Sequence, residues 1–234
     1  MKSPADYREL LRAGRWFRNL SSELQDQLLS AATLKRFSPN QTVMARGQPR
    51  AGLFGVLEGA IRVGGSTEAG DQSLLVLAEP PTWFGEIALI DGGPMTHDAV
   101  VVRAALVVFI PAARLDQLAQ QDPAWWRELA RLMAIKVRLL FDTLEEQALL
   151  PASAQLARRL VLMAEGYGGW TAQTSRVLEV SQEQLATMLA VSRQTVNQVL
   201  KTFEAAQLVR VCYAGLEILD LPGLKHASGE MLLP

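Results

Sequence analysis

The chain has 234 residues, of which 49% are hydrophobic, with a formal net charge of -1 and a single cysteine, Cys212. This length and apolar content suit one large domain or two modest ones. One cysteine excludes an intrachain disulfide scaffold, a Cys-ligated zinc site and an iron–sulfur cluster. The N-terminus shows no apolar signal core, and no apolar run approaches the roughly 18 residues of a membrane span, so we expect a cytoplasmic protein.

The first half of the chain changes from a helical to a β pattern. Residues 4–35 are typical of helices, with buried positions expected at Trp16, Phe17, Leu20, Leu24 and Leu28. From Phe37 to about Pro111, short apolar runs alternate with turn sequences, and glycines recur at Gly47, Gly55, Gly59, Gly70 and Gly85. This pattern predicts an antiparallel β-barrel or jelly roll.

A long helix is predicted after the β region. Asp122 can cap it and Pro123 suits its first position, and Pro151 ends it after about Leu149. Its apolar residues follow a heptad spacing typical of a coiled-coil seam: Trp126, Ala130, Met133, Val137, Leu140, Leu144 and Gln147. We interpret this stripe as a dimer seam formed chiefly by Trp126, Met133, Val137, Leu140 and Leu144, the alternative being a helix that packs on its own barrel.

Residues 181–201, after a further helix at 153–166, have the pattern of a helix-turn-helix. Ser181 and Gln184 can form a capping box for a first helix, which would bury Leu185, Met188 and Leu189. Ser192 can cap a second helix with Val196, Val199 and Leu200 facing inward. Ala190 stands at the turn, where a left-handed conformation costs an alanine little.

The outward side of the second helix carries side chains that can read base edges in a major groove: Arg193, Gln194, Asn197, Gln198 and Lys201. From residue 151 onward, seven Lys/Arg are balanced by seven Asp/Glu, so this prediction rests on local placement and not on net charge. Residues 208–221 alternate around Tyr213-Ala214-Gly215, as in a hairpin wing, and we expect a loosely held tail from Pro222.

Three stretches together resemble the CRP/FNR family of bacterial transcription regulators. Residues 85–94, GEIALIDGGP, are similar to the family's phosphate-binding cassette, and residues 191–196, VSRQTV, to the start of its recognition helix. Residues 54–59, with Gly47 before them, match its barrel glycine pattern. The resemblance implies an α+β fold: a sensor barrel at 1–121, a dimerisation helix at 122–150 and a winged helix-turn-helix at 151–234.

Two departures from the family bear on the ligand. In cyclic-AMP-binding relatives an arginine of the cassette neutralises the cyclic phosphate, but here the matching pair is Met95-Thr96. A methionine cannot form that charge-assisted contact. The resemblance also places a Thr-Ser pair against adenine, and the matching residues here are Leu140 and Phe141. We therefore predict that the barrel does not bind cyclic AMP.

The resemblance still leaves an effector pocket at the positions that match the cassette and the long helix: Gly85, Glu86, Ile87, Ala88, Met95, Thr96, Leu140 and Phe141. One alternative is a different, less anionic ligand or haem, for which Met95 and His97 are possible axial ligands. The other is a vestigial pocket in a dimer that is constitutively competent or controlled by its abundance. For His97 we expect a loop histidine bonded to Asp98, and for Glu86 a structural role through backbone hydrogen bonds.

For the recognition helix the resemblance places Arg193 against a guanine. Gln194 stands where the family usually has Glu, and Gln198 where it often has Arg, so we expect a half-site that differs from TGTGA and favours A·T near one retained G. Ser181, Ser192, Thr195 and Lys201 suit phosphates, and Asn197 suits a base or the backbone. The implied partners are double-stranded DNA with a near-palindromic site, a second copy of the chain and RNA polymerase, with no membrane and no enzymatic activity. A cupin-type enzyme is disfavoured because the chain has only two histidines.

Overall fold

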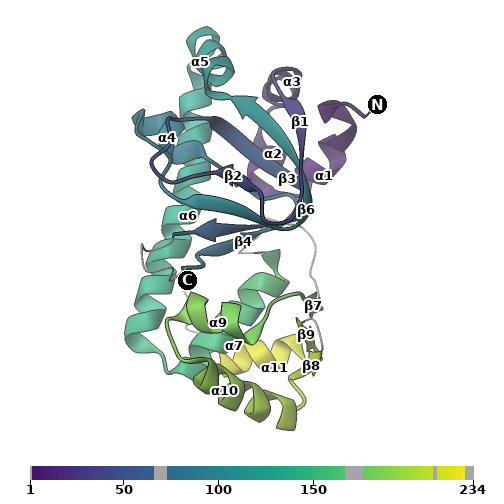
Figure 1. Cartoon of the computed structure of the whole chain (residues 1–234), viewed down its shortest axis with the longest axis vertical. Helices are drawn as coiled ribbons and strands as arrows, with labels where there is room; N and C mark the ends of the chain where they lie inside the picture. The colour runs from purple at the N-terminus through teal and green to yellow at the C-terminus, as the bar shows by residue number, and fades with distance from the viewer. Residues whose placement is uncertain (1, 66–72, 167–175, 213–214, 230–234) are drawn as a thin grey trace. The chain divides into compact units, whose positions relative to one another are not determined.

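The computed structural model describes residues 2–65, 73–166, 176–212 and 215–229 (Figure 1). It divides into two compact units, Met1–Arg138 and Leu139–Pro234, so the boundary falls inside the long helix. Gly70, the turn pair Tyr213-Ala214 and the end of the tail lie outside the described residues. Among the described residues, no helix has the combined length and apolarity that crossing a bilayer requires.

The first unit consists of short N-terminal helices, a β-sheet and the start of the long helix. In chain order its elements are η1 (Pro4–Tyr7), α1 (Arg8–Arg12), α2 (Arg15–Asn19), α3 (Ser22–Ser30), β1 (Thr33–Phe37), β2 (Thr42–Met44), β3 (Gly52–Gly64), β4 (Val76–Ala78), β5 (Trp83–Phe84), α4 (Glu86–Asp91), β6 (Asp98–Pro111), α5 (Ala112–Gln121) and α6 (Ala124–Leu149), the last of which runs on into the second unit.

The sheet is antiparallel and is built around two long strands, β3 and β6. Its strand order is β1-β6-β3-β4, with β2 also paired to β6 and β5 to β3. Leu53 faces Ile110 and Val56 faces Val107 in the register of the central pair. Along β3 the register shifts between Glu58 and Ala60, where Gly59 has a φ of +81°. A Cβ on Gly59 would lie 2.2 Å from the Ala104 carbonyl oxygen, so this bulge requires glycine.

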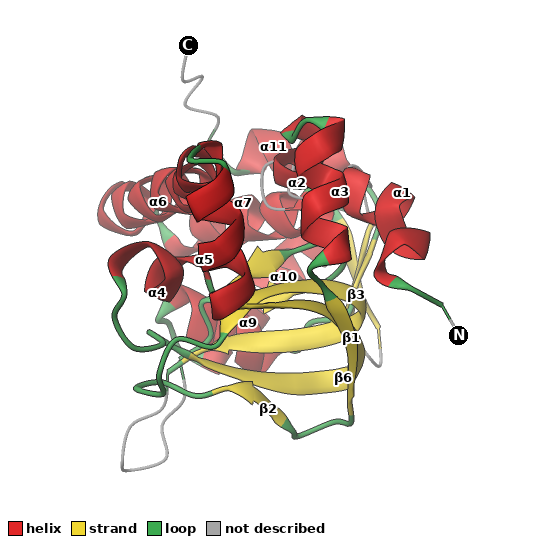
Figure 2. Ribbon diagram, turned by 90° about the horizontal axis from the view of Figure 1, so that it is seen from above, coloured by secondary structure: helices red, strands yellow, loops and turns green. Residues whose placement is uncertain are grey.

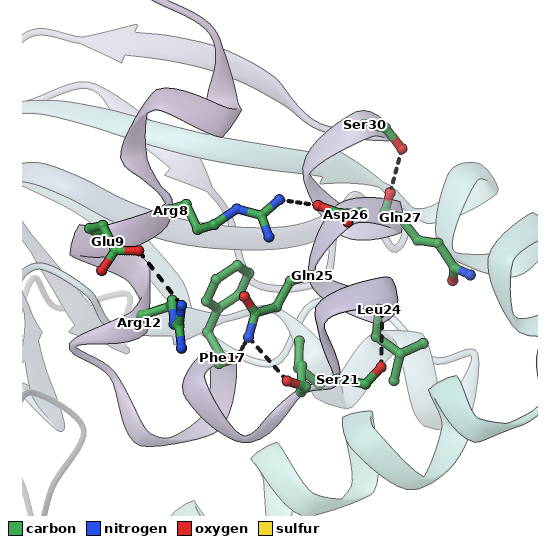
Figure 3. Close-up of polar contacts among 11 residues, drawn as sticks. Arg8, Glu9, Arg12, Phe17, Ser21, Leu24, Gln25, Asp26, Gln27 and Ser30 are labelled. Carbon is green, nitrogen blue, oxygen red and sulfur yellow. Dashed lines mark hydrogen bonds and ion pairs between the residues drawn. The ribbon is translucent and has the colours of Figure 1, made fainter.

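The N-terminal helices close one side of the sheet (Figure 2). Trp16, Phe17, Leu20, Leu24 and Leu28 are all at most 8% exposed, which confirms the predicted buried positions. Polar contacts fix the helices to one another (Figure 3). The Gln25 amide donates to the carbonyls of Phe17 (3.1 Å) and Leu20 (3.0 Å), and Arg8 pairs with Asp26. The helical pattern ends at Ser30 rather than near residue 35, because Thr33–Phe37 pairs with β6.

The long helix α6 begins and ends where the sequence predicts. The Asp122 carboxylate accepts a hydrogen bond from the backbone N–H of Ala124 (2.9 Å), and the helix ends at Leu149 before Pro151. In the first unit it buries Trp125, Glu128, Leu129 and Leu132, of which Trp125 is fully buried. Its apolar side chains therefore divide into a buried set and the exposed heptad set described below.

The second unit is a small helical domain with a three-stranded sheet of order β7-β9-β8. Beyond α6, its described elements are α7 (Ala152–Ala164), β7 (Val177–Leu178), α9 (Gln182–Leu189), α10 (Arg193–Ala205), β8 (Val209–Cys212), β9 (Gly215–Ile218) and α11 (Leu221–Ala227). The prediction of a loosely held tail is wrong for its first part. Asp220 caps α11 through the Gly223 N–H (3.0 Å), and Leu224 is fully buried in the core of this unit.

Candidate DNA interface and effector cassette

The turn between α9 and α10 is set by two caps and one left-handed residue. Ser181 Oγ accepts from the Gln184 N–H (3.1 Å), while Gln184 Oε1 accepts from the Ser181 N–H (2.8 Å), so the predicted capping box is present. Ala190 adopts φ 53° and ψ 38°, and the next N–H, of Val191, donates back to the Ala186 carbonyl (3.1 Å). This is the hydrogen bond of a Schellman ending, which turns the chain sharply.

Helix α10 has one buried face and one exposed polar face. Ser192 Oγ accepts from the Thr195 N–H (3.0 Å) and caps the helix. Val196, Leu200 and Phe203 are at most 5% exposed in the core of the second unit. Around the opposite side lie the exposed Arg193, Gln194, Gln198 and Lys201, with the half-buried Thr195 and Asn197 among them. These side chains occupy the face predicted to read DNA.

Two contacts link this face to α9. Asn197 Nδ2 donates to Gln182 Oε1 over 3.1 Å, and Arg193 Nε lies 4.0 Å from Glu183 Oε2. Both partners of the ion pair are about 70% exposed, so water screens it and it adds little stability. Arg193 can therefore leave Glu183 for a nucleic-acid acceptor at small cost. Sequence reasoning missed Gln182 and Glu183, since no local pattern indicates a contact across the turn.

The predicted wing is a β-hairpin of β8 and β9. Val209 pairs with Ile218 and Cys212 with Gly215. Arg210 and Glu217 form an exposed ion pair across the two strands, with Nη1 and Oε2 2.9 Å apart. A Cβ on Gly215 would lie 2.1 Å from the Leu178 carbonyl oxygen, so β9 can approach β7 closely only with glycine at this position.

The cassette begins at Gly85, which caps α4 with a φ of +103°. A Cβ there would lie 2.4 Å from the Gly52 carbonyl oxygen, which explains the glycine. The next residue, Glu86, is 1% exposed, and its Oε2 accepts from Lys136 Nζ over 2.6 Å. We expected backbone N–H groups around this carboxylate, but the hydrogen bond that it accepts comes from the side chain of a residue on α6. Lys136 was missed because nothing in its local sequence indicates this partner.

Met95 and Thr96 stand where cyclic-AMP-binding relatives have the phosphate-binding arginine and its neighbour. Met95 is buried in the hydrophobic core, and Thr96 is half-buried. Met95 is 2% exposed and packs in the hydrophobic cluster that includes Met44 and Phe54. Its backbone is fixed on both sides, because its N–H donates to the Gln48 carbonyl and its carbonyl accepts from the Gly47 N–H, each over 2.8 Å. Ala88 is also buried, whereas Ile87 and Thr96 are half-buried.

Arg46 and His97 accompany the cassette loop. Arg46 Nε donates to the Thr96 carbonyl (3.0 Å), and the Arg46 backbone N–H donates to Asp98 Oδ1 (2.9 Å). His97 Nδ1 lies 2.9 Å from Thr96 Oγ1, whereas the influence seen from the expected partner Asp98 is that of its charge. Burial, and secondly the charge of Arg46, lower the pKa of His97, so the imidazole stays neutral near pH 7.

The predicted seam residues form an exposed apolar stripe on α6. The exposed fractions are 43% for Trp126, 37% for Val137, 53% for Leu140 and 51% for Leu144, and Met133 is half-buried. Phe141, next to the stripe, is 59% exposed. These apolar side chains are exposed on the face of α6 that the heptad spacing predicts as the dimer seam.

The start of the second unit contains a partly buried ion pair. Glu146 on α6 pairs with Arg158 on α7, with Oε1 and Nε 2.5 Å apart. Burial raises the pKa of Glu146 above its usual range, although Arg158 acts in the opposite direction. Arg159, the next residue on α7, is 7% exposed. The junction of the two helices therefore depends on charged groups that are largely removed from water.

Comparison with known proteins agrees with the fold. Residues 34–122 match the cyclic nucleotide-binding domain model, and residues 154–227 match the Crp-like helix-turn-helix domain model. A CRP-like cAMP-activated global transcriptional regulator of Mycobacterium tuberculosis is 26% identical over 187 residues, which is 77% of this chain and 84% of the relative. The transcriptional regulator LdrP of Thermus thermophilus is 28% identical over 201 residues, 85% of this chain and 98% of the relative.

Solved structures show the same likeness. A CRP-family transcriptional regulator from Thermus thermophilus superimposes with a TM-score of 0.66 and 26% identity, covering 85% of this chain and 98% of the other. The antiparallel β domain, the long helix and the winged helix-turn-helix thus define a sensor-linked DNA-binding regulator. The chain belongs to the CRP/FNR family of transcription regulators.

Proposed function

We propose that this regulator binds a near-palindromic DNA site as a homodimer, with α10 of each protomer in a major groove. The observation that supports this most strongly is the division of α10 into a buried face and an exposed polar face behind a doubly capped turn. A two-fold dimer would present its recognition helices to successive major grooves, about 34 Å apart. RNA polymerase is the further partner that we expect on the bound DNA.

Arg193 is the proposed guanine reader, and Gln194 the reader of a neighbouring adenine. A guanidinium can donate to both O6 and N7 of guanine, and a glutamine amide can pair with N6 and N7 of adenine. Ser181 uses its hydroxyl oxygen to accept a cap hydrogen bond, which leaves its O–H group to donate to a phosphate. The Ser192 hydroxyl accepts from the Thr195 N–H and also lies 2.8 Å from Thr195 Oγ1, so one O–H of the Ser192–Thr195 pair is left to donate to a phosphate. Lys201, exposed one turn beyond Asn197, is the proposed phosphate contact at the far end of the face.

The DNA proposal is tested by binding selection followed by titration of a fluorescent duplex. Arg193→Ala should weaken specific binding by about 1–3 kcal/mol and relax the preference at one base pair of each half-site. Arg114→Ala is a matched control, since Arg114 is an exposed arginine of the first unit whose guanidinium contacts only Gln117 among the described residues. An unaltered affinity of Arg193→Ala would place the recognition surface elsewhere. Selection of TGTGA half-sites by the wild type would refute the predicted change of half-site.

On the input side, we propose that the cassette does not bind cyclic AMP. Met95 fills a core position and offers no charge to a phosphate, and the buried carboxylate of Glu86 is already paired with Lys136. Burying a cyclic phosphate without a guanidinium partner would cost several kcal/mol. Titration calorimetry with cyclic AMP should give no saturable heat, with the cAMP-activated relative from Mycobacterium tuberculosis as the positive control. Saturable binding at micromolar concentration would refute this part of the proposal.

The alternative on the input side is another small ligand or a haem group. Met95 is a poor candidate for a haem ligand because its side chain packs among Met44, Phe54 and other core residues. Native mass spectrometry of the protein as purified should show the mass of the bare chain or of its dimer. An additional mass, or a Soret absorption band, would establish the alternative.

A further inference from the structure

Asn197 is held differently from the other polar residues of the recognition face. Its side-chain Nδ2 donates to Gln182 Oε1 over 3.1 Å, and Gln182 is the first residue of α9. Gln194 and Gln198 are exposed, and no side-chain hydrogen bond holds either of them among the described residues. Asn197 is therefore the amide of this face that the protein itself holds in place.

That orientation has a chemical consequence. A carboxamide can rotate by 180° and exchange its donor and acceptor ends, which exchanges the base edges it complements. In the structure Gln182 presents its carbonyl oxygen, so the Nδ2 end of Asn197 is the end that faces α9. One Nδ2 hydrogen is used in this bond, and the second Nδ2 hydrogen and the Oδ1 acceptor stay available. One donor and one acceptor are the complement of the N7 and N6 positions of adenine in the major groove.

The position of Asn197 on α10 is compatible with base contact. It stands one turn after Arg193 and one turn before Lys201, so it lies on the same face as both. It is half-buried, and the link to Gln182 removes side-chain freedom before any DNA is bound. Immobilising a side chain on binding costs about 0.5–1.5 kcal/mol, and here the folded protein has already met part of that cost.

We propose that Gln182 is a positioning residue that fixes Asn197 as a reader of one adenine in each half-site. Gln182 acts through Asn197 and not through a base contact of its own. The inference rests on the proposed function, since it assumes that α10 enters the major groove. It adds a specificity determinant on α9 and names the base that Asn197 selects.

The experiment compares four variants on a panel of duplexes in which each base pair of the selected half-site is changed in turn. Asn197→Ala should reduce the preference for adenine at one position by about 5- to 150-fold. Gln182→Ala should reduce the preference at the same position by about 2- to 13-fold. The double variant should match Asn197→Ala alone, because Gln182 acts only through Asn197. Gln182→Glu keeps an oxygen acceptor for Nδ2, so the preference should persist while the added negative charge lowers affinity for every duplex equally.

Three results would overturn the proposal: additive losses in the double variant, losses at different base pairs, or a uniform loss of affinity in Gln182→Ala with base preference retained. The last would make Gln182 a phosphate contact. Thermal unfolding of each variant separates these effects from loss of the fold, and the exposed or half-buried positions predict small changes. Arg193→Ala is measured in parallel. If it retains full specific binding as well, the recognition surface itself is wrong; if it loses binding while the amide variants do not, only this inference fails.

Discussion

Leu140→Asp is the substitution that tests the proposed dimer most directly. Leu140 occupies the centre of the exposed stripe on α6 and is 53% exposed in the single chain. In a two-fold interface the same residue meets its own copy or a near neighbour, so one substitution changes both sides. An aspartate would remove apolar area at that point and place two carboxylates close together.

The size of the effect follows from the exposed fraction. Full burial of a leucine side chain is worth about 1.5–3 kcal/mol, so covering the exposed half of Leu140 contributes roughly 1 kcal/mol in each protomer and about 2 kcal/mol in the dimer. Desolvating two like charges adds at least about 1 kcal/mol to the loss. The total of about 3 kcal/mol predicts a dimer dissociation constant raised by at least about 100-fold.

Sedimentation velocity over a range of protein concentrations measures this constant. Leu149→Asp is the matched control, because Leu149 is 67% exposed on the same helix but does not follow the heptad spacing of the stripe. We expect a monomer for Leu140→Asp under conditions where the wild type and Leu149→Asp are dimers. An unchanged sedimentation coefficient for Leu140→Asp would refute the assignment of the stripe as the seam.

Further predictions concern stability and pH. Ala190→Gly should stabilise the α9–α10 turn by up to about 1 kcal/mol, because glycine carries no steric penalty at φ 53°. Ala205→Gly, the same change in the helical last turn of α10, should instead cost about 1 kcal/mol. Slower amide exchange in residues 181–201 for the first variant and faster exchange for the second would agree with this, and equal shifts would not. Burial raises the pKa of Glu146, so the folded state binds that proton more tightly than the unfolded state does. The resulting stabilisation of the folded state is complete below pH 4.5 and is lost as the pH rises through the raised pKa of Glu146. Glu146→Gln should remove this pH dependence from the free energy of unfolding measured in urea. Burial lowers the pKa of His97, so the stabilisation that the neutral imidazole gives the fold is complete above pH 6.5 and is lost as the pH falls through the lowered pKa. His97→Gln should therefore flatten the pH dependence of unfolding over that range. A His97→Gln profile that keeps the wild-type slope would contradict the lowered pKa of His97.

The helix-turn-helix could be predicted from sequence because its determinants are local. Ser181 and Gln184 are three residues apart, Ser192 and Thr195 likewise, and each pair forms the expected cap. Apolar residues at helical spacing then decided which face is buried. The tail was mispredicted for the opposite reason: Leu224 is buried by packing on the core of the second unit, and one apolar residue in a Gly- and Pro-containing segment carries no signal for that contact.

The contacts at the candidate sites that sequence reasoning missed join residues distant in the chain. Lys136 meets Glu86 across 50 residues, and Gln182 meets Asn197 across 15. A side chain of either kind on a helix surface is ordinarily solvated, so its residue type alone predicts no partner. The register that brings each pair together is set by the tertiary packing of the elements that carry them.

The cassette shows how the backbone path of a family can be kept where one side chain differs. Backbone contacts fix the path of the cassette. Gly85 is left-handed and lies beside the Gly52 carbonyl, and the Met95 backbone is hydrogen-bonded to Gly47 and Gln48. None of these contacts uses the side chain at position 95, so an arginine there can be replaced by a methionine without losing the turn. Residues 34–122 match a cyclic nucleotide-binding domain model as a whole, whereas the charge that a cyclic phosphate requires is a property of one side chain. In this chain that side chain is in the hydrophobic core, and the remaining buried carboxylate has an ammonium from the same protein as its partner. The persistence of the shape is thus compatible with an input that differs from that of the cAMP-activated relatives.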